Sequence, residues 1–224
     1  MSLLALALAP GIVLLIYIYI QDKYEHEPLK EVLKAFLAGS ASAIVLIIIY
    51  LTTGGFQEKT IHGFIPALHK AFFQAALPEE TIKFIPFLLL FYKNKEFNEW
   101  FDGIVYASVI SLGFATVENI LYVTSSDIST GISRAFLAVP AHFIMGITQG
   151  FFFSLAKFKN HSLIYISLAL ISAIIVHTLY DALLFTGQDI FLLIFFLYFI
   201  SITWLTKRLI KFHLNKSQFK SRQN

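Results

Sequence analysis

Cysteine is absent from this sequence, and charged residues are scarce. None of the 224 residues is cysteine, and only 14% are Asp, Glu, Lys or Arg. The chain therefore forms no disulfide bond and offers no thiolate as a metal ligand or nucleophile. A soluble domain typically has about 25% charged residues, so this chain has too little polar surface to keep its apolar side chains in water. The 57% of hydrophobic residues, which include 24 phenylalanines, predict an integral membrane protein instead.

Apolar runs long enough to cross a bilayer recur along the whole chain, since a span needs roughly 20 apolar residues. Seven runs cover residues 3–20, 31–52, 67–92, 102–124, 134–156, 162–186 and 189–206. The first run is expected to be a retained span, because it lacks a basic amino-terminal region and a cleavage site before Asp22. We predict an all-α polytopic bundle of about seven transmembrane helices. One domain is expected over residues 1–214, followed by a basic polar tail over residues 215–224.

The positive charges predict how the bundle is oriented. Most lysines and arginines lie in one set of loops and in the tail, whereas the opposite set of loops contains only Lys59 and Arg134. Excess positive charge stays in the cytoplasm, so we expect the amino terminus outside and the tail inside, close to anionic lipid. The net charge of +3 is explained by this distribution, and no nucleic-acid partner is expected.

A few ionisable residues lie within the predicted spans, where they are costly unless they have a pairing or functional role. They are Glu79, Glu80, Lys83, Glu118, His142, His177 and Asp181. At about 1.5 Å per residue, the acidic and histidine side chains lie roughly 8–18 Å from the outer ends of four different spans. We therefore predict one polar cavity in the outer half of the membrane.

The segment Pro78-Glu79-Glu80-Thr81-Ile82-Lys83 suggests a general base. Residues four apart share a helix face, so we expect Lys83 to pair with Glu79 and Glu80 to have less compensation. Adjacent carboxylates near a third one, Glu118, cannot all ionise easily at low dielectric, and a poised carboxylate is what activation of water requires. The alternative is an acidic pair that begins a helix after Pro78.

Histidines on two other spans could complete such a site. Asp181 lies one helical turn after His177, where it could hold the imidazole tautomer and support its charge. The alternative is a self-satisfied polar pair that fixes helix packing. His142 shares its helix face with Gly146 and Gly150, and we expect these glycines to let two helices approach closely.

Taken in order, the segments PEETIKF, FDGIVYASVISLGFATVEN, HFIMGITQG and HTLYD resemble the PrsW family of prokaryotic intramembrane proteases, within a wider group that includes the CAAX prenyl endopeptidases and Abi proteins. The family motif EExxK matches Glu79, Glu80 and Lys83. The motifs FxxxE and HxxxD match Phe114 with Glu118 and His177 with Asp181, and His142 matches the histidine before the glycine pair. The first loop, Glu25 to Pro28, departs from the Glu-Pro-Glu-Pro often found in the family.

The resemblance implies hydrolysis of a peptide bond in a membrane-anchored, single-span protein in a prokaryotic cell membrane, and known members act on anti-sigma factors. For the mechanism, Glu79 or Glu80 would activate water and Lys83 would tune that pair. His177 with Asp181 would stabilise the oxyanion or protonate the leaving amine, and the site would be completed by Glu118 and His142.

A metal-dependent version can also be written. Glu118, His142 and His177 offer nitrogen and oxygen ligands that suit zinc, with Glu79 or Glu80 as the base. We favour catalysis without a cofactor, because the paired glutamates need no further component. Two other classes of protein compete with a protease. A transporter or channel would also gather ionisable residues at one depth, although it often has internal repeats, and a scaffold could keep the fold without the chemistry.

Overall fold

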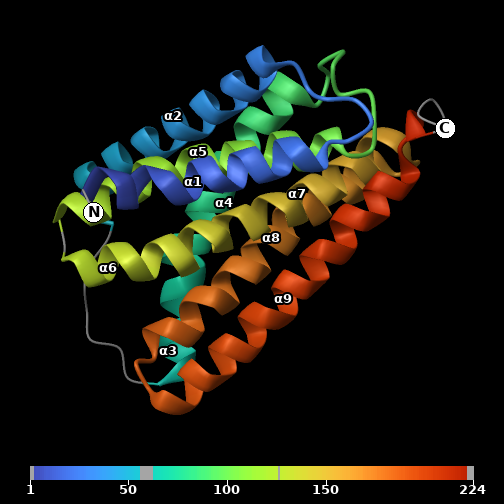
Figure 1. The fold of residues 1–224 in the computed structure, drawn as a ribbon. Coiled ribbons are helices and arrows are strands. Elements are labelled where there is room, and N and C mark those ends of the chain that lie inside the picture. Colours follow the sequence, from blue (N-terminus) through green and yellow to red (C-terminus); the bar gives the residue numbers. More distant parts are fainter. Residues whose placement is uncertain (1–2, 56–62, 126, 221–224) are drawn as a thin grey trace.

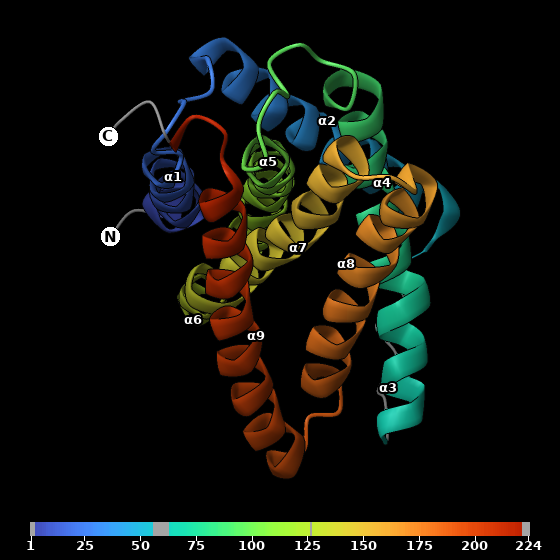
Figure 2. The ribbon, with the colours of Figure 1, turned by 90° about the vertical axis from the view of Figure 1, so that its right-hand side faces the viewer.

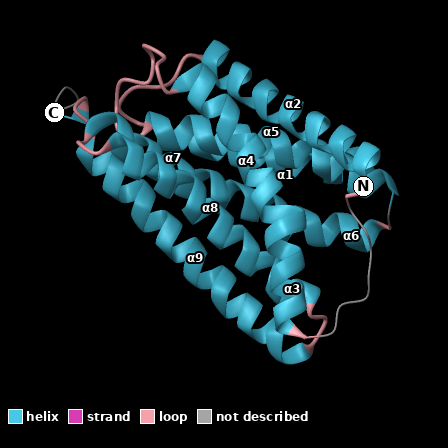
Figure 3. Cartoon of the chain, turned by 180° about the vertical axis from the view of Figure 1, so that it is seen from behind, coloured by secondary structure: helices cyan, strands magenta, loops and turns pink. Residues whose placement is uncertain are grey.

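The computed structural model describes residues 3–55, 63–125 and 127–220, and this part of the chain contains helices and loops without strands (Figure 3). The predicted all-α bundle is confirmed. The helical segments are α1 (Leu3–Gln21), α2 (Leu29–Thr53), α3 (Phe64–Lys70), η1 (Ala71–Ala76), α4 (Leu77–Pro86), η2 (Phe87–Phe91), α5 (Asp102–Ser125), α6 (Ile128–Ser133), η3 (Arg134–Ala138), α7 (Val139–Phe158), α8 (Ser162–Phe185) and α9 (Asp189–Lys216). The three η segments are π-helical and continue the neighbouring α-helices without a loop.

The predicted spans match the observed helices closely. Among the described residues, 6 helices are long and apolar enough to cross a membrane. The predicted span 67–92 corresponds to the helical run from α3 to η2, which π-helical segments divide into shorter pieces. The total of seven spans and the orientation of the termini stay predictions. Lys59 and Arg222, which were assigned to opposite sides of the membrane, lie outside the described residues.

Helix α5 forms the centre of the bundle. Its residues are buried almost continuously from Asp102 to Thr116. It packs against α7, α2 and α1 (Figures 1 and 2). A second group of helices, α3, α8 and α9, extends away from this centre, with α8 joined to it through α7. The polar residues of α5, α7 and α8 therefore meet where the two groups join.

Glycines allow the helices around α5 to approach closely. A Cβ atom added at Gly150 of α7 would overlap the backbone of Gly103 in α5, and one at Gly146 would come within 2.8 Å of the carbonyl oxygen of Ala107. The prediction that these two glycines serve helix packing is confirmed. Gly113 of α5 plays the same part against the backbone of Phe36 in α2.

The carboxyl-terminal helix extends beyond the predicted domain boundary at residue 214. Helix α9 continues to Lys216, and the Ser217 hydroxyl donates a hydrogen bond to Glu99 Oε2. The beginning of the predicted tail is therefore packed against the bundle, because Ser217 satisfies a buried carboxylate. The last residues of the predicted tail, 221–224, lie outside the described part of the chain.

Candidate active site

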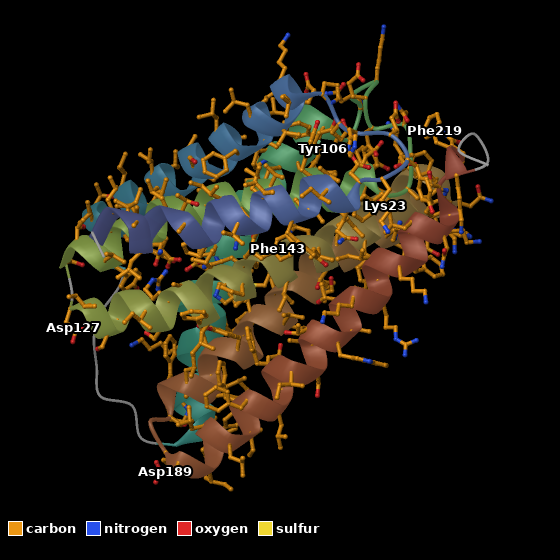
Figure 4. All side chains as sticks on the ribbon, viewed as in Figure 1. Lys23, Tyr106, Asp127, Phe143, Asp189 and Phe219 are labelled. Carbon is orange, nitrogen blue, oxygen red and sulfur yellow. The ribbon has the colours of Figure 1, made fainter. Side chains whose placement is uncertain are left out.

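The structure brings together all seven ionisable residues that were singled out within the spans. Helix α4 contributes Glu79, Glu80 and Lys83, α5 contributes Glu118, α7 contributes His142, and α8 contributes His177 and Asp181. Hydrogen bonds and ion pairs of 2.6–4.0 Å connect them in one network. In Figure 4, Phe143, the residue after His142 on α7, lies near the middle of the molecule.

Prolines explain the local structure of the elements that carry this network. Each π-helical segment lies next to a proline, and the one before α4 is followed by Pro78. Proline has no backbone N–H to donate to the carbonyl four residues earlier. That carbonyl, of Gln74, instead accepts a hydrogen bond of 2.7 Å from the Tyr50 hydroxyl of α2. A π-helical turn changes the direction in which the side chains after it point. Here the turn η1 sets the direction of Glu79 and Glu80.

Glu80 is the ion-pair partner of Lys83. Its Oε1 lies 2.6 Å from Lys83 Nζ and 2.7 Å from His177 Nδ1. The predicted pairing of Lys83 with Glu79 is therefore wrong. Spacings of three and four residues both share a helix face, and the tertiary partners decide between them: Lys83 Nζ also donates to His142 Nδ1 of α7 at 3.2 Å, while His177 of α8 holds Glu80.

The hydrogen-bond partners define the protonation of both histidines. His142 Nδ1 accepts from the Lys83 ammonium, and its Nε2 lies 2.9 Å from Glu118 Oε2, so a neutral ring with the proton on Nε2 satisfies both contacts. His177 faces a carboxylate at each nitrogen, Glu80 at Nδ1 and Asp181 at 3.2 Å from Nε2. Because a carboxylate only accepts, His177 is assigned as an imidazolium that donates from both nitrogens.

Glu118 has a partner that the sequence analysis missed. Arg134, the first residue of η3, donates from Nη2 to Glu118 Oε2 at 2.9 Å and from Nε to Asn119 Oδ1 at 3.2 Å. Its guanidinium also lies 4.0 Å from the centroid of the Tyr122 ring. From the sequence, Arg134 is expected to be a loop charge that orients the protein. Positive charges are rare on the predicted outer side, where only Lys59 and Arg134 occur, and this rarity was the available sign that Arg134 has a second role.

Glu79 has no such compensation. It is 6% exposed, and its Oε2 is buried without a hydrogen-bond partner. The one ion pair that it forms within the described chain is a contact of 4.0 Å with His177 Nε2. One of the two adjacent glutamates does lack a close positively charged partner, as predicted. That glutamate is Glu79, however, and the prediction that it would be Glu80 is wrong.

Two cavities meet at Glu79 and Glu118. A polar cavity of about 450 Å³ is lined by both glutamates and by Arg134, His142, His177 and Asp181, among others. An apolar cavity of about 490 Å³ lies between α2 and α5, with Ala43, Leu46 and Leu121 in its wall. Glu79 and Glu118 line both cavities, so the carboxylate of Glu79 is reached from a polar side and from an apolar side.

Comparison with known proteins matches the sequence of this chain to a family. A model described as PrsW family intramembrane metalloprotease matches residues 27–206, which include every residue of the network. The chain belongs to the PrsW family. It is an intramembrane protease, a multi-pass membrane protein of bacterial type.

Several curated PrsW proteases are similar over most of their length. The chain is 38% identical to a protease PrsW of Geobacillus kaustophilus over 188 residues, 84% of this chain and 81% of that protein. It is 36% identical to one of Oceanobacillus iheyensis over 186 residues, 82% and 83% of the two chains. For a protease PrsW of Bacillus subtilis the identity is 31% over 185 residues, again 82% and 83%. No solved structure matches the chain.

The family description as metalloproteases raises the question of whether this PrsW chain can hold a metal. Glu79, Glu118 and His142 each offer a ligand atom, and these atoms lie within 4.8 Å of one another. One imidazole nitrogen and two carboxylates suit zinc, and the buried Glu79 Oε2 has no other partner, so the donor set fits. It differs from the predicted set in containing Glu79 in place of His177.

Proposed function

We propose that Glu79 is the general base that activates water for peptide hydrolysis in this protease. The observation that carries the proposal is the Glu79 carboxylate, whose buried Oε2 has no hydrogen-bond partner and which lies where the polar and apolar cavities meet. A base must be free to take a proton from water. Glu80 is held by Lys83 and His177, and Glu118 by Arg134 and His142, which makes both poorer bases.

His177 supports the other half of the reaction. Water attacks the scissile carbonyl carbon as Glu79 takes its proton, and negative charge develops on the carbonyl oxygen. The His177 imidazolium can donate a hydrogen bond to that oxygen if its Nε2–H turns from Asp181, 3.2 Å away, to the substrate while Glu80 keeps Nδ1. When the carbon–nitrogen bond breaks, a proton from His177 passes to the leaving amine, and the proton on Glu79 restores His177.

The remaining polar residues position these groups. Lys83 holds Glu80 in place and donates to His142, and Arg134 holds Glu118 at the edge of the same cavity. A zinc ion held by Glu79, Glu118 and His142 would polarise the substrate carbonyl and lower the pKa of bound water, and it would then activate water in place of Glu79, which would be a ligand. Glu80 and Asp181 would hold His177 as the proton donor whether or not zinc is bound.

The substrate is a membrane-anchored protein, of the single-span, anti-sigma-factor type by family resemblance. The apolar cavity between α2 and α5 has a wall of aliphatic side chains such as Leu46 and Leu121, and a substrate segment coming from lipid would fit against such a wall. Unsatisfied backbone is costly in lipid. A locally unwound segment therefore gains by moving to the polar cavity, where donors such as Arg134 and His177 are present.

The test is cleavage of candidate single-span substrates by the purified full-length protein. Glu79→Gln is expected to lower the rate of cleavage by about 10²–10⁴-fold, the usual contribution of a general base. Asp189→Asn is the matched control, because Asp189 is an exposed carboxylate at the beginning of α9, and it should cleave like wild type. Wild-type rates for Glu79→Gln would show that another group activates water.

A further inference from the structure

A second group of buried carboxylates lies at the other end of α5. It comprises Asp22 after α1, Glu99 in the loop before α5, and Asp102, the first residue of α5, and all three are 0% exposed. Asp102 precedes Glu118 by 16 residues, which is about 24 Å along a helix. Lys23, which follows Asp22, and Tyr106, four residues after Asp102, are labelled toward one end of the molecule in Figure 4, far from Asp127 and Asp189. The group is therefore separate from the candidate active site.

Each of these carboxylates is held through one oxygen. Asp22 Oδ2 accepts from the backbone N–H of Glu27 at 3.0 Å, and Asp102 Oδ2 accepts from the N–H groups of Asn98 and Glu99 at 2.8 and 2.7 Å. Glu99 Oε2 accepts from the Ser217 hydroxyl. Backbone N–H groups therefore orient Asp22 and Asp102, and a side-chain hydroxyl from the end of α9 orients Glu99.

The second oxygen of each carboxylate has no hydrogen-bond partner. Asp22 Oδ1, Glu99 Oε1 and Asp102 Oδ1 are buried and unpartnered. Within the described part of the chain, no ion pair joins the three side chains to a lysine, arginine or histidine. Buried polar atoms are almost always satisfied, and three buried carboxylates without a cation repel one another. This arrangement points to a positively charged ligand.

We propose that Asp22, Glu99 and Asp102 bind a hard divalent cation, Ca²⁺ or Mg²⁺. One ligand oxygen from each residue lies within 4.8 Å of the others. Oxygens on opposite sides of a Ca²⁺ ion, at about 2.3–2.6 Å from it, are about 5 Å apart, so one ion can contact all three. Carboxylate oxygens are the ligands that these cations prefer, whereas the absence of imidazole and thiolate from the group disfavours zinc.

The bound cation would join segments that are far apart in the sequence. Asp22 belongs to the connection between α1 and α2, Glu99 to the connection between η2 and α5, and Ser217, which holds Glu99, to the end of α9. A ligand that binds only the folded state stabilises it. The alternative occupant is protons, since burial raises the pKa of Asp22 to about 8, and the experiment must separate the two.

Terbium luminescence tests the proposal, because Tb³⁺ occupies oxygen sites of this kind and is excited through nearby aromatic side chains. Trp100 follows Glu99 in the sequence, and Tyr106 donates to Glu27 in the same region. The full-length protein, stripped with a chelator at neutral pH, should give saturable Tb³⁺ emission that Ca²⁺ or Mg²⁺ displaces. Asp22→Asn and Glu99→Gln should each weaken Tb³⁺ binding by about tenfold or more, as losses of metal-site groups do.

Glu79→Gln is the matched control for Tb³⁺ bound at the candidate active site, and it should keep the emission. The Tm of the wild type should rise with added Ca²⁺ or Mg²⁺, and that of Asp22→Asn should not. Absence of saturable emission from the wild type, or equal emission from Asp22→Asn and Glu99→Gln, would overturn the proposal. A wild-type Tm that does not change with either cation would also overturn the proposal. A higher Tm for Asp22→Asn than for the wild type in the same buffer would show that protons, and not a cation, occupy the site.

Discussion

Two adjacent glutamates are expected to respond differently to the same isosteric substitution. Glu80 is 1% exposed and is bonded to Lys83 at 2.6 Å and to His177 at 2.7 Å. Glu80→Gln would leave a buried ammonium and a buried imidazolium without this counter-charge. Breaking a buried pair by removing one partner costs about 3–5 kcal/mol. For a chain of this length, about 2–4 °C of Tm per kcal/mol gives a decrease of ~6–20 °C.

Glu79→Gln should leave stability almost unchanged. Glu79 forms no hydrogen bond through its buried Oε2, and its contact with His177 is 4.0 Å long. Replacing a poorly compensated buried carboxylate by a neutral amide removes little attraction and also removes a desolvation cost. We expect a Tm within about 3 °C of wild type, together with the loss of cleavage described above.

The assay is thermal unfolding of both variants and the wild type in one detergent, with cleavage measured on the same preparations. The double variant Glu80→Gln, Lys83→Met removes both charges of the pair and should recover part of the lost Tm, because the ammonium is no longer stranded. An equal decrease in Tm for Glu79→Gln and Glu80→Gln would refute the assignment of ion pairs. Normal cleavage by Glu79→Gln would refute its role as the base.

Three further outcomes follow from the contacts. Arg134→Gln should lower cleavage by about 10–100-fold with little change in Tm, because Arg134 positions Glu118; a rate equal to wild type would contradict this role. Gly150→Ala should cost about 1–3 kcal/mol in thermal unfolding, since the new methyl overlaps the backbone of Gly103, whereas Gly131→Ala, whose Cβ would meet its nearest atom at 3.4 Å, should be tolerated. Elemental analysis of purified protein after addition of zinc should find the metal in His177→Ala but not in Glu118→Gln or His142→Ala. Loss of zinc from all three variants would favour the ligand set predicted from the sequence, which contains His177.

Much of the fold was predictable because lipid imposes simple rules on sequence. A span must be about 20 apolar residues long, and every predicted run coincides with an observed helical run to within several residues, except that α9 continues ten residues beyond the predicted end at 206, to Lys216. The span from α3 to η2 is helical as predicted, but its prolines introduce π-helical segments that hydropathy does not reveal. The close contact of α7 with α5 was also predictable, since Gly146 and Gly150 lie on one helix face.

The residues that gather at the site could be predicted, but their pairing could not. Spacing along α4 allowed Lys83 to reach either glutamate, and only the positions of His142 and His177 on other helices made Glu80 the partner. Arg134 looked like a loop charge until η3 placed its guanidinium against Glu118. Likewise, no local pattern joins Asp22, Glu99 and Asp102, which come from three segments of the chain.

The sequence by itself indicated that this chain lies in a membrane, which of its segments are long and apolar enough to cross it, and which few ionisable residues lie within those segments. The physical cause is the cost of charge in lipid, which acts on each residue singly and so can be read along the chain. Only the tertiary structure decided which charges neutralise each other and which carboxylate oxygen, Glu79 Oε2, is left without a hydrogen bond. Ion pairing depends on distances of a few ångströms between helices, and spacing along one helix does not contain those distances.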